Sequence, residues 1–147
     1  MYDRADVLSR EAIGAAISVQ RSFGPGLLES IYHRCLAHEL DLRGIRSATQ
    51  RTVRIVYRGL EFDEVLRCDL LVEDCLLLEL KAVEHVLGIH KAQLLTYMRL
   101  LDVPIGLLMN FHERPLAAGI QRLVLPGADR AEPCEVGDVD LQGHRKP

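Results

Sequence analysis

Apolar side chains recur at helical spacing in two segments at the start of the chain. Residues 6–23 follow this spacing, and either Asp6 or Ser9 is suited to cap the helix that it predicts. The Gly-Pro-Gly stretch at 24–26 ends this helix, because proline cannot continue the hydrogen-bond ladder and glycine tolerates turn dihedrals. A second apolar stripe predicts another helix over 27–44.

The pattern then changes to strands, with one helical segment among them. The sequence predicts strands at 52–57, 61–72 and 76–82, a helix at 88–102, and strands at 105–111 and 116–125. This order predicts an α/β (α+β) fold, a mixed sheet flanked by helices, in one domain over residues 1–125. Residues 126–147 are rich in Gly, Pro and charge, so we expect a poorly ordered C-terminal tail.

Composition supports a globular domain of ordinary character. The chain has 147 residues, of which 48% are hydrophobic and 27% charged, enough for one core. The net charge of −3 is not the basic balance typical of a chain whose main task is to clamp phosphates, although a local basic surface remains compatible with it. No segment resembles a signal peptide or a membrane span, and the cysteines lack zinc spacing. We therefore expect a cytoplasmic protein with reduced thiols.

Three charged side chains interrupt the apolar strands in the middle of the chain. Glu79 and Lys81 project from the same face of one strand, and Asp69 lies on the strand before it. If residues 73–75 form a three-residue loop, Asp69 lies opposite Glu79, whereas a two-residue loop would place it beside Leu78. Two facing carboxylates would suit Mg²⁺ or Mn²⁺. A plain ion pair of Lys81 with either carboxylate is the alternative.

The spacing D69…E79-L80-K81 after an apolar strand resembles the PD-(D/E)XK nuclease superfamily. The helix that follows contains Gln93 and Tyr97, which resemble the QxxxY motif of its RecB-like branch. The earlier "GLLESIY" resembles the pattern that names the GxxExxY family of small bacterial proteins in this superfamily, and the likeness extends over residues 6–125. Cys68 stands where the superfamily name has proline.

The resemblance implies a restriction-endonuclease-like fold and a role for each motif residue. Asp69 and Glu79 would be metal ligands, assisted by the Leu80 carbonyl, and Lys81 would be the catalytic lysine. Glu29 would act as an additional metal ligand or orient water.

Further residues would frame the site. The resemblance implies that Gln93 and Tyr97 contact DNA or Lys81, and we expect Tyr32 to contribute to substrate binding or else to pack in the core. Surface or loop positions are expected for four histidines: His33, His38, His85 and His90. The alternatives are that His33 points toward the site and that His85 or His90 reaches phosphate. A charged edge strand is expected for the arginine run between the second helix and the first strands, with a phosphate-contacting strip as the alternative; these residues are Arg43, Arg46, Arg51, Arg54 and Arg58.

The resulting hypothesis is a metal-dependent nuclease that hydrolyses phosphodiester bonds of nucleic acid, DNA in the first place, with water as nucleophile. Two alternatives remain open at this point. One is a catalytically silent nucleic-acid-binding module, and the other is a protein-interaction subunit that keeps the fold. A small domain such as this could also need a second copy or another protein to hold a duplex.

Overall fold

A computed structural model describes residues 1–128 of the chain. Its elements follow the order expected from the sequence, with one short 3-10 helix in addition. They are α1 (Tyr2–Phe23), α2 (Glu29–Leu42), β1 (Ser47–Tyr57), β2 (Leu60–Val72), β3 (Leu76–Lys81), α3 (Gly88–Leu101), β4 (Ile105–Asn110), η1 (Leu116–Gly119) and β5 (Ile120–Val124).

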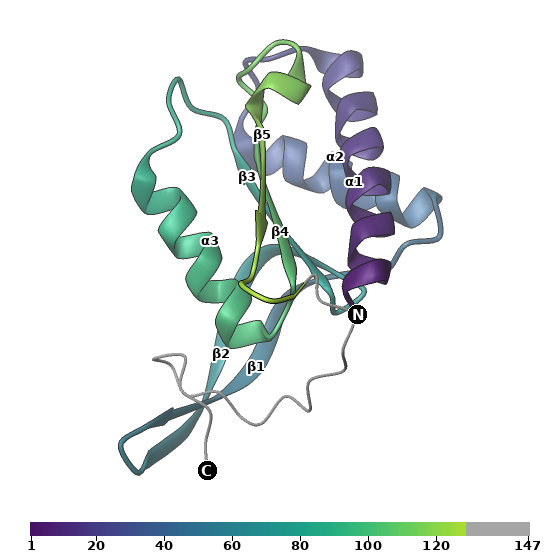
Figure 1. Ribbon diagram of the computed structural model, residues 1–147. Helices are drawn as coiled ribbons and strands as arrows, with labels where there is room; N and C mark the ends of the chain where they lie inside the picture. Colours follow the sequence, from purple (N-terminus) through teal and green to yellow (C-terminus); the bar gives the residue numbers. More distant parts are fainter. Residues whose placement is uncertain (129–147) are drawn as a thin grey trace.

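The five strands form one mixed sheet in the order β1-β2-β3-β4-β5 (Figure 1). Strands β1, β2 and β3 pair in antiparallel fashion, and β5 is antiparallel to β4. Only β3 and β4 are parallel, and the chain crosses between them through α3. A parallel pair requires such a crossover, so α3 is held against the sheet beside the end of β3.

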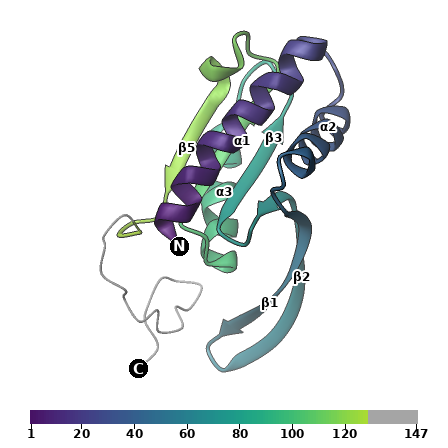
Figure 2. The same cartoon turned by 90° about the vertical axis from the view of Figure 1, so that its right-hand side faces the viewer.

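Helices cover both faces of the sheet (Figure 2). Leu70, Leu78 and Leu80 pack with α1 and α2, whereas Leu71 and Leu77 pack with α3 on the opposite face. Side chains alternate along a strand, so β2 and β3 supply both cores in turn. The buried side of α1 is largely alanine, which lets this helix lie close to the sheet. The predicted mixed α+β sheet flanked by helices is confirmed.

Several element boundaries differ from the predictions. Helix α1 begins at Tyr2, so Asp6 and Ser9 lie inside it and do not cap it. Both side chains instead accept hydrogen bonds from Arg122 on β5, at 2.7 and 2.8 Å. Strand β1 begins five residues earlier than expected, at Ser47. The expected tail lies, from residue 129 onward, outside the described residues.

The last predicted strand is also shorter than expected. Residues 116–119 form a 3-10 helix, closed by a hydrogen bond from the Ala118 N–H to the Pro115 carbonyl at 3.0 Å. Only residues 120–124 form the strand. Within residues 1–128, no helix is long and apolar enough to cross a membrane.

Strands β1 and β2 extend beyond the sheet as a two-stranded arm, residues 50–67 (Figures 1 and 2). A two-residue turn at Arg58 and Gly59 closes the arm, and both residues have positive φ, as such hairpin turns require. Several large apolar side chains of the arm are exposed: Tyr57, Leu60, Phe62 and Val65. The expected charged edge strand is present, because β1 is the outer strand and its Arg54 pairs with Glu61.

Candidate active site

The hairpin between β2 and β3 decides which strand residues face one another. Pairing runs through Leu70 with Leu78, Leu71 with Leu77 and Val72 with Leu76. This register is the one expected for a loop of residues 73–75, and its ladder ends one step before Asp69 and Glu79. The charge of Asp69 acts on Glu79. The two carboxylates therefore lie together at the point where the ladder between β2 and β3 ends.

The turn that fixes this register is held from outside the hairpin. Glu73 and Asp74 both have positive φ, a conformation that side chains other than glycine adopt rarely. The Cys75 N–H donates to the Val72 carbonyl at 3.1 Å and closes the turn. Arg4 from α1 donates two hydrogen bonds to the Glu73 carboxylate, at 2.6 and 3.1 Å. Helix α1 thus holds the turn that aligns the two carboxylates.

A bulge in β2 lies at Asp69 itself. Ala48 pairs with Leu71 and Gln50 pairs with Arg67. Between these two pairs β2 advances by four residues, whereas β1 advances by two. Bulges interrupt the ladder and redirect side chains, and they are frequent beside active sites. Here the Asp69 carboxylate accepts a hydrogen bond from the main-chain N–H of buried Leu80 at 2.7 Å. This contact lies beyond the last paired residues of β2 and β3, Leu70 and Leu78.

Glu79 and Lys81 form an ion pair, with 3.1 Å between Oε1 and Nζ. Burial raises the pKa of Glu79, the charges of Asp69 and Glu29 raise it further, and Lys81 opposes this change. Burial alone would lower the pKa of Lys81, but the ion pair with Glu79 and the charges of Glu29 and Asp69 outweigh it and raise that pKa. The site therefore holds one protonated amine among three acidic side chains.

The pKa of Cys68, the residue before Asp69, is also affected by the negative charges of the site. Burial, followed by the charges of Asp69 and Glu79, raises its pKa to about 11, and Arg51 opposes this change. The thiol is therefore protonated at neutral pH and is a poor nucleophile or metal ligand. Together with Cys35 and Cys75 it is a free cysteine, as expected, whereas Cys134 lies outside the described residues.

Helix α2 contributes two side chains to the site. Glu29 lies in its first turn, half-buried, and its charge acts on both Glu79 and Lys81. His33, one turn further on the same helix face, donates from Nε2–H to the main-chain carbonyl of Asp69 at 2.7 Å. His33 therefore does not have the surface position expected for it but the alternative one, pointing toward the site, and its ring is part-buried against β2.

Tyr32 has a different environment from the one expected of a substrate-binding residue. Its ring is 1% exposed and stacks on Phe111 with 4.6 Å between the ring centroids. Its hydroxyl donates to the Gly24 carbonyl at 2.5 Å and accepts from the Leu27 N–H at 3.1 Å. Tyr32 thus holds the glycine-proline turn that leads into α2, whose first residue is Glu29.

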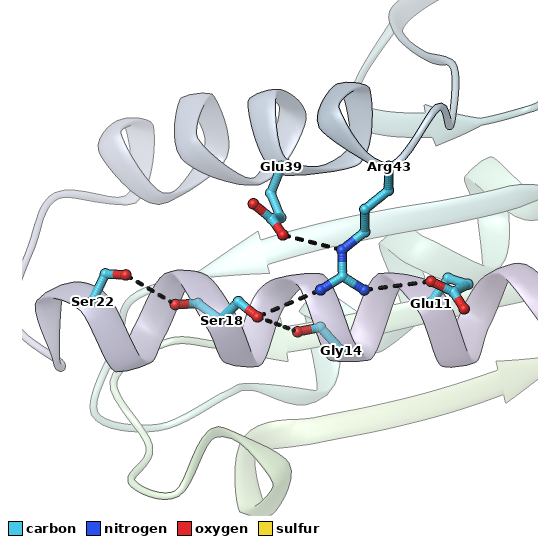
Figure 3. Close-up of polar contacts among 6 residues, drawn as sticks. All are labelled: Glu11, Gly14, Ser18, Ser22, Glu39 and Arg43. Carbon is cyan, nitrogen blue, oxygen red and sulfur yellow. Dashed lines mark hydrogen bonds and ion pairs between the residues drawn. The ribbon is translucent and has the colours of Figure 1, made fainter.

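The position of α2 depends on a polar contact with α1 (Figure 3). Arg43 near the C-terminal end of α2 donates to Glu39 at 3.1 Å, to Glu11 at 3.4 Å and to the Ser18 hydroxyl at 3.5 Å. A groove of about 730 Å³ opens between the same two helices, lined by residues such as Ser18, Arg34 and Glu39. None of the candidate site residues line it.

Asn110 is a supporting residue that the sequence analysis did not identify. It pairs in register with Lys81 and is only 2% exposed. Its side-chain amide accepts from the Val83 N–H at 3.1 Å and donates to the Val83 carbonyl at 2.8 Å. Asn110 thereby fixes the backbone just after the lysine. The signal was visible as a single amide at the end of the apolar run in residues 105–111.

Gln93 and Tyr97 lie on α3, on one helix face as predicted. Gln93 is exposed, and Tyr97 is half-buried against the core between α3 and the sheet. Within residues 1–128, neither takes part in the hydrogen bonds of Asp69 or in the ion pair of Glu79 with Lys81. His85 is exposed, as expected, while His90 caps the start of α3 by accepting from the Leu87 N–H at 3.1 Å.

The donor set suits a hard divalent cation. Asp69 and Glu79 provide carboxylate oxygens, and the Leu80 carbonyl points to the same strand edge as the N–H that Asp69 accepts. Among the described residues, no three His, Cys, Asp or Glu side chains are grouped closely enough to hold a metal by themselves. Two carboxylates, a carbonyl and waters match the preference of Mg²⁺ or Mn²⁺ rather than that of Zn²⁺.

The fold is a mixed sheet in which Asp69, Glu79 and Lys81 gather where the ladder between β2 and β3 ends. A sequence model of the PD-(D/E)XK nuclease superfamily matches residues 6–123, and the chain belongs to this superfamily. Neither the curated proteins nor the solved structures that were compared with the chain include a match.

Proposed function

We propose that this protein is a metal-dependent nuclease, which hydrolyses a phosphodiester bond with water as the nucleophile. The observation that carries this proposal is the ion pair of half-buried Lys81 with Glu79, whose carboxylate also feels the charge of Asp69 at the end of the β2–β3 ladder. Membership in a superfamily of nucleases supports the same reaction class.

Each residue of the site has a separate role in this proposal. Asp69, Glu79 and the Leu80 carbonyl hold the cation. A divalent cation bound there supplies polarisation of the phosphate and acidification of a nearby water. Lys81, protonated at neutral pH and oriented by Glu79, stabilises negative charge as it develops on the phosphate. Glu29 accepts a hydrogen bond from water at the entrance of the site.

Finer assignments are also part of the proposal. We propose Mg²⁺ or Mn²⁺ as the cation, DNA as the substrate, and a setting in the bacterial cytoplasm. The motif of Gly26, Glu29 and Tyr32 supports assignment to the GxxExxY family. Gly26 has a φ of 106°, which favours glycine, and Tyr32 holds the turn that contains it. Exposed Gln93 and half-buried Tyr97 are proposed to contact nucleic acid from α3.

The test is cleavage of end-labelled single-stranded and duplex DNA and RNA, with Mg²⁺, Mn²⁺ or chelator. We expect divalent-dependent cleavage that falls by at least about 100-fold in Lys81→Ala, because an electrostatic stabiliser of the transition state is lost. Lys91→Ala is the matched control, since Lys91 is exposed on α3. Cleavage that persists in Lys81→Ala or in chelator would reject the proposed site.

The apolar arm favours a second candidate function. Tyr57, Leu60 and Phe62 are each at least 41% exposed on one face of the projecting hairpin, and exposed apolar patches mark interaction surfaces. Under this alternative the protein is a binding subunit for nucleic acid or protein, with a catalytically silent site. Salt-sensitive binding to nucleic acid without divalent-dependent cleavage would favour the first form. A stable protein complex would favour the second.

A further inference from the structure

We propose that His33 is a positioning residue for Asp69, which fixes the metal-binding carboxylate by holding its main chain from α2. The inference rests on the proposed function only in taking Asp69 as a metal ligand. The contact that carries it is the 2.7 Å hydrogen bond between His33 Nε2 and the Asp69 carbonyl oxygen.

The direction of this hydrogen bond is unambiguous. A main-chain carbonyl only accepts, so Nε2 must carry the proton and donate it. The partner that a strand residue would ordinarily have at this position is missing, because the bulge interrupts pairing between β1 and β2 from Ala48 to Gln50. His33 therefore supplies the donor that β1 does not.

Asp69 is thus held at two points on opposite sides. Its carboxylate accepts from the Leu80 N–H on β3, and its carbonyl accepts from His33 on α2. Without the hydrogen bond from His33, the main-chain carbonyl of Asp69 has no donor in its place from β1, because Asp69 lies in the bulge. The metal-binding carboxylate would then project from a less firmly held residue. Hydrogen bonds that orient metal ligands typically change metal affinity by about 10–100-fold when they are removed.

Helix α2 is well suited to act as a fixed support for this contact. Leu36 and Leu40 are fully buried in the core that α2 shares with the sheet, and Arg43 joins the helix to α1 (Figure 3). Glu29 lies one turn before His33 on the same face. One rigid helix therefore sets the positions of Glu29 and Asp69 relative to each other.

Glutamine and asparagine both replace the histidine N–H with an amide N–H, but they place it at different distances from the main chain. The side-chain amide of glutamine lies where Nε2 does, whereas that of asparagine stops at the position of Nδ1. We expect His33→Ala and His33→Asn to weaken Mn²⁺ binding by about 10–100-fold, and His33→Gln to restore most of the affinity. His38→Asn is the control, because His38 lies on the same helix but lines the groove between α1 and α2.

Calorimetric titration of Mn²⁺ into the wild type and these variants measures the effect without nucleic acid. Amide hydrogen exchange at Leu80 in chelator measures it without metal, because that N–H is protected by Asp69. We expect faster exchange in His33→Asn than in the wild type or His33→Gln. Unchanged exchange in His33→Asn, or His33→Gln as impaired as His33→Ala, would overturn the positioning role.

The two measurements also separate this inference from the proposed function. If the wild type binds no Mn²⁺ and cleaves nothing, the nuclease proposal fails, yet exchange at Leu80 still decides whether His33 positions Asp69. If Mn²⁺ binds equally well to the wild type and to His33→Asn, the result supports the proposed metal site and contradicts the positioning role of His33.

Discussion

Replacement of Asp69 by alanine tests whether this carboxylate is a structural acceptor as well as a metal ligand. In the wild type, Asp69 accepts the Leu80 N–H at 2.7 Å, and Leu80 is fully buried. Alanine leaves that N–H without a partner, at a cost of about 1–3 kcal/mol in free energy of unfolding. Asparagine keeps an acceptor oxygen and removes the charge that, after burial, contributes most to the raised pKa of Glu79. It should therefore cost less than about 1 kcal/mol.

Urea denaturation in chelator measures both variants without interference from metal. With an m-value of about 2 kcal/mol per molar urea, the loss in Asp69→Ala lowers the midpoint by about 0.5–1.5 M. By calorimetry, each kcal/mol corresponds to about 2–4 °C in Tm for a chain of this size. Asp63→Ala is the control, because Asp63 is exposed on the same strand and its loss should stay within about 0.5 kcal/mol.

Two outcomes would refute the reasoning. A midpoint for Asp69→Ala equal to that of the wild type would mean that the Leu80 N–H finds another acceptor. A loss in Asp69→Asn as large as that in Asp69→Ala would mean that charge, rather than the accepted hydrogen bond, stabilises the strand end.

Three further predictions concern the charges of the site. Mn²⁺ at 100 times its dissociation constant should stabilise the wild type by about 2.7 kcal/mol but not Asp69→Asn, and equal stabilisation by scanning fluorimetry would place the ion elsewhere. The pKa of Glu79 is higher in the folded protein than its usual value of 4.5, because of burial and the charge of Asp69. In chelator, the free energy of unfolding of the wild type should therefore fall as the pH rises from 4.5 to the pKa of folded Glu79. Glu79→Gln lacks this fall, and urea midpoints whose difference stays constant over that window would contradict the prediction. The pKa of Cys68 is raised from 9.0 to about 11. In a variant that keeps only this cysteine, alkylation at pH 8 should therefore be about 100-fold slower than alkylation of a small-molecule thiol. Equal alkylation rates would refute the raised pKa.

The parts of the fold that follow from local pattern were predictable. Alternation and turn residues specify the element order, and the odd loop at residues 73–75 is sufficient to align Asp69 with Glu79. The continuous apolar run of β4 predicted a buried strand, and every residue of β4 is buried because the strand lies between β3 and β5. For the element order and the hairpin register, the determining contacts are close along the chain.

The parts that depend on packing between distant segments were not predictable. The bulge at Asp69 has no glycine or proline to mark it, since it arises where β2 leaves the register of β1. The contact of His33 requires the docking of α2, which brings together residues 36 positions apart. The motif containing Tyr32 could not reveal that its ring is buried, because a pattern of residue types says nothing about exposure.

The bulge in β2 has a consequence for how this protein can change over evolution. The alignment of Asp69 with Glu79 is set by the turn at residues 73–75, whereas the length of the arm is set by its own turn at Arg58 and Gly59. Paired insertions or deletions in the arm leave the alignment of the two carboxylates unchanged, because the bulge separates the two registers. The hairpin is therefore a module that can diversify, lengthen or be exchanged between relatives while the chemistry behind it is inherited intact.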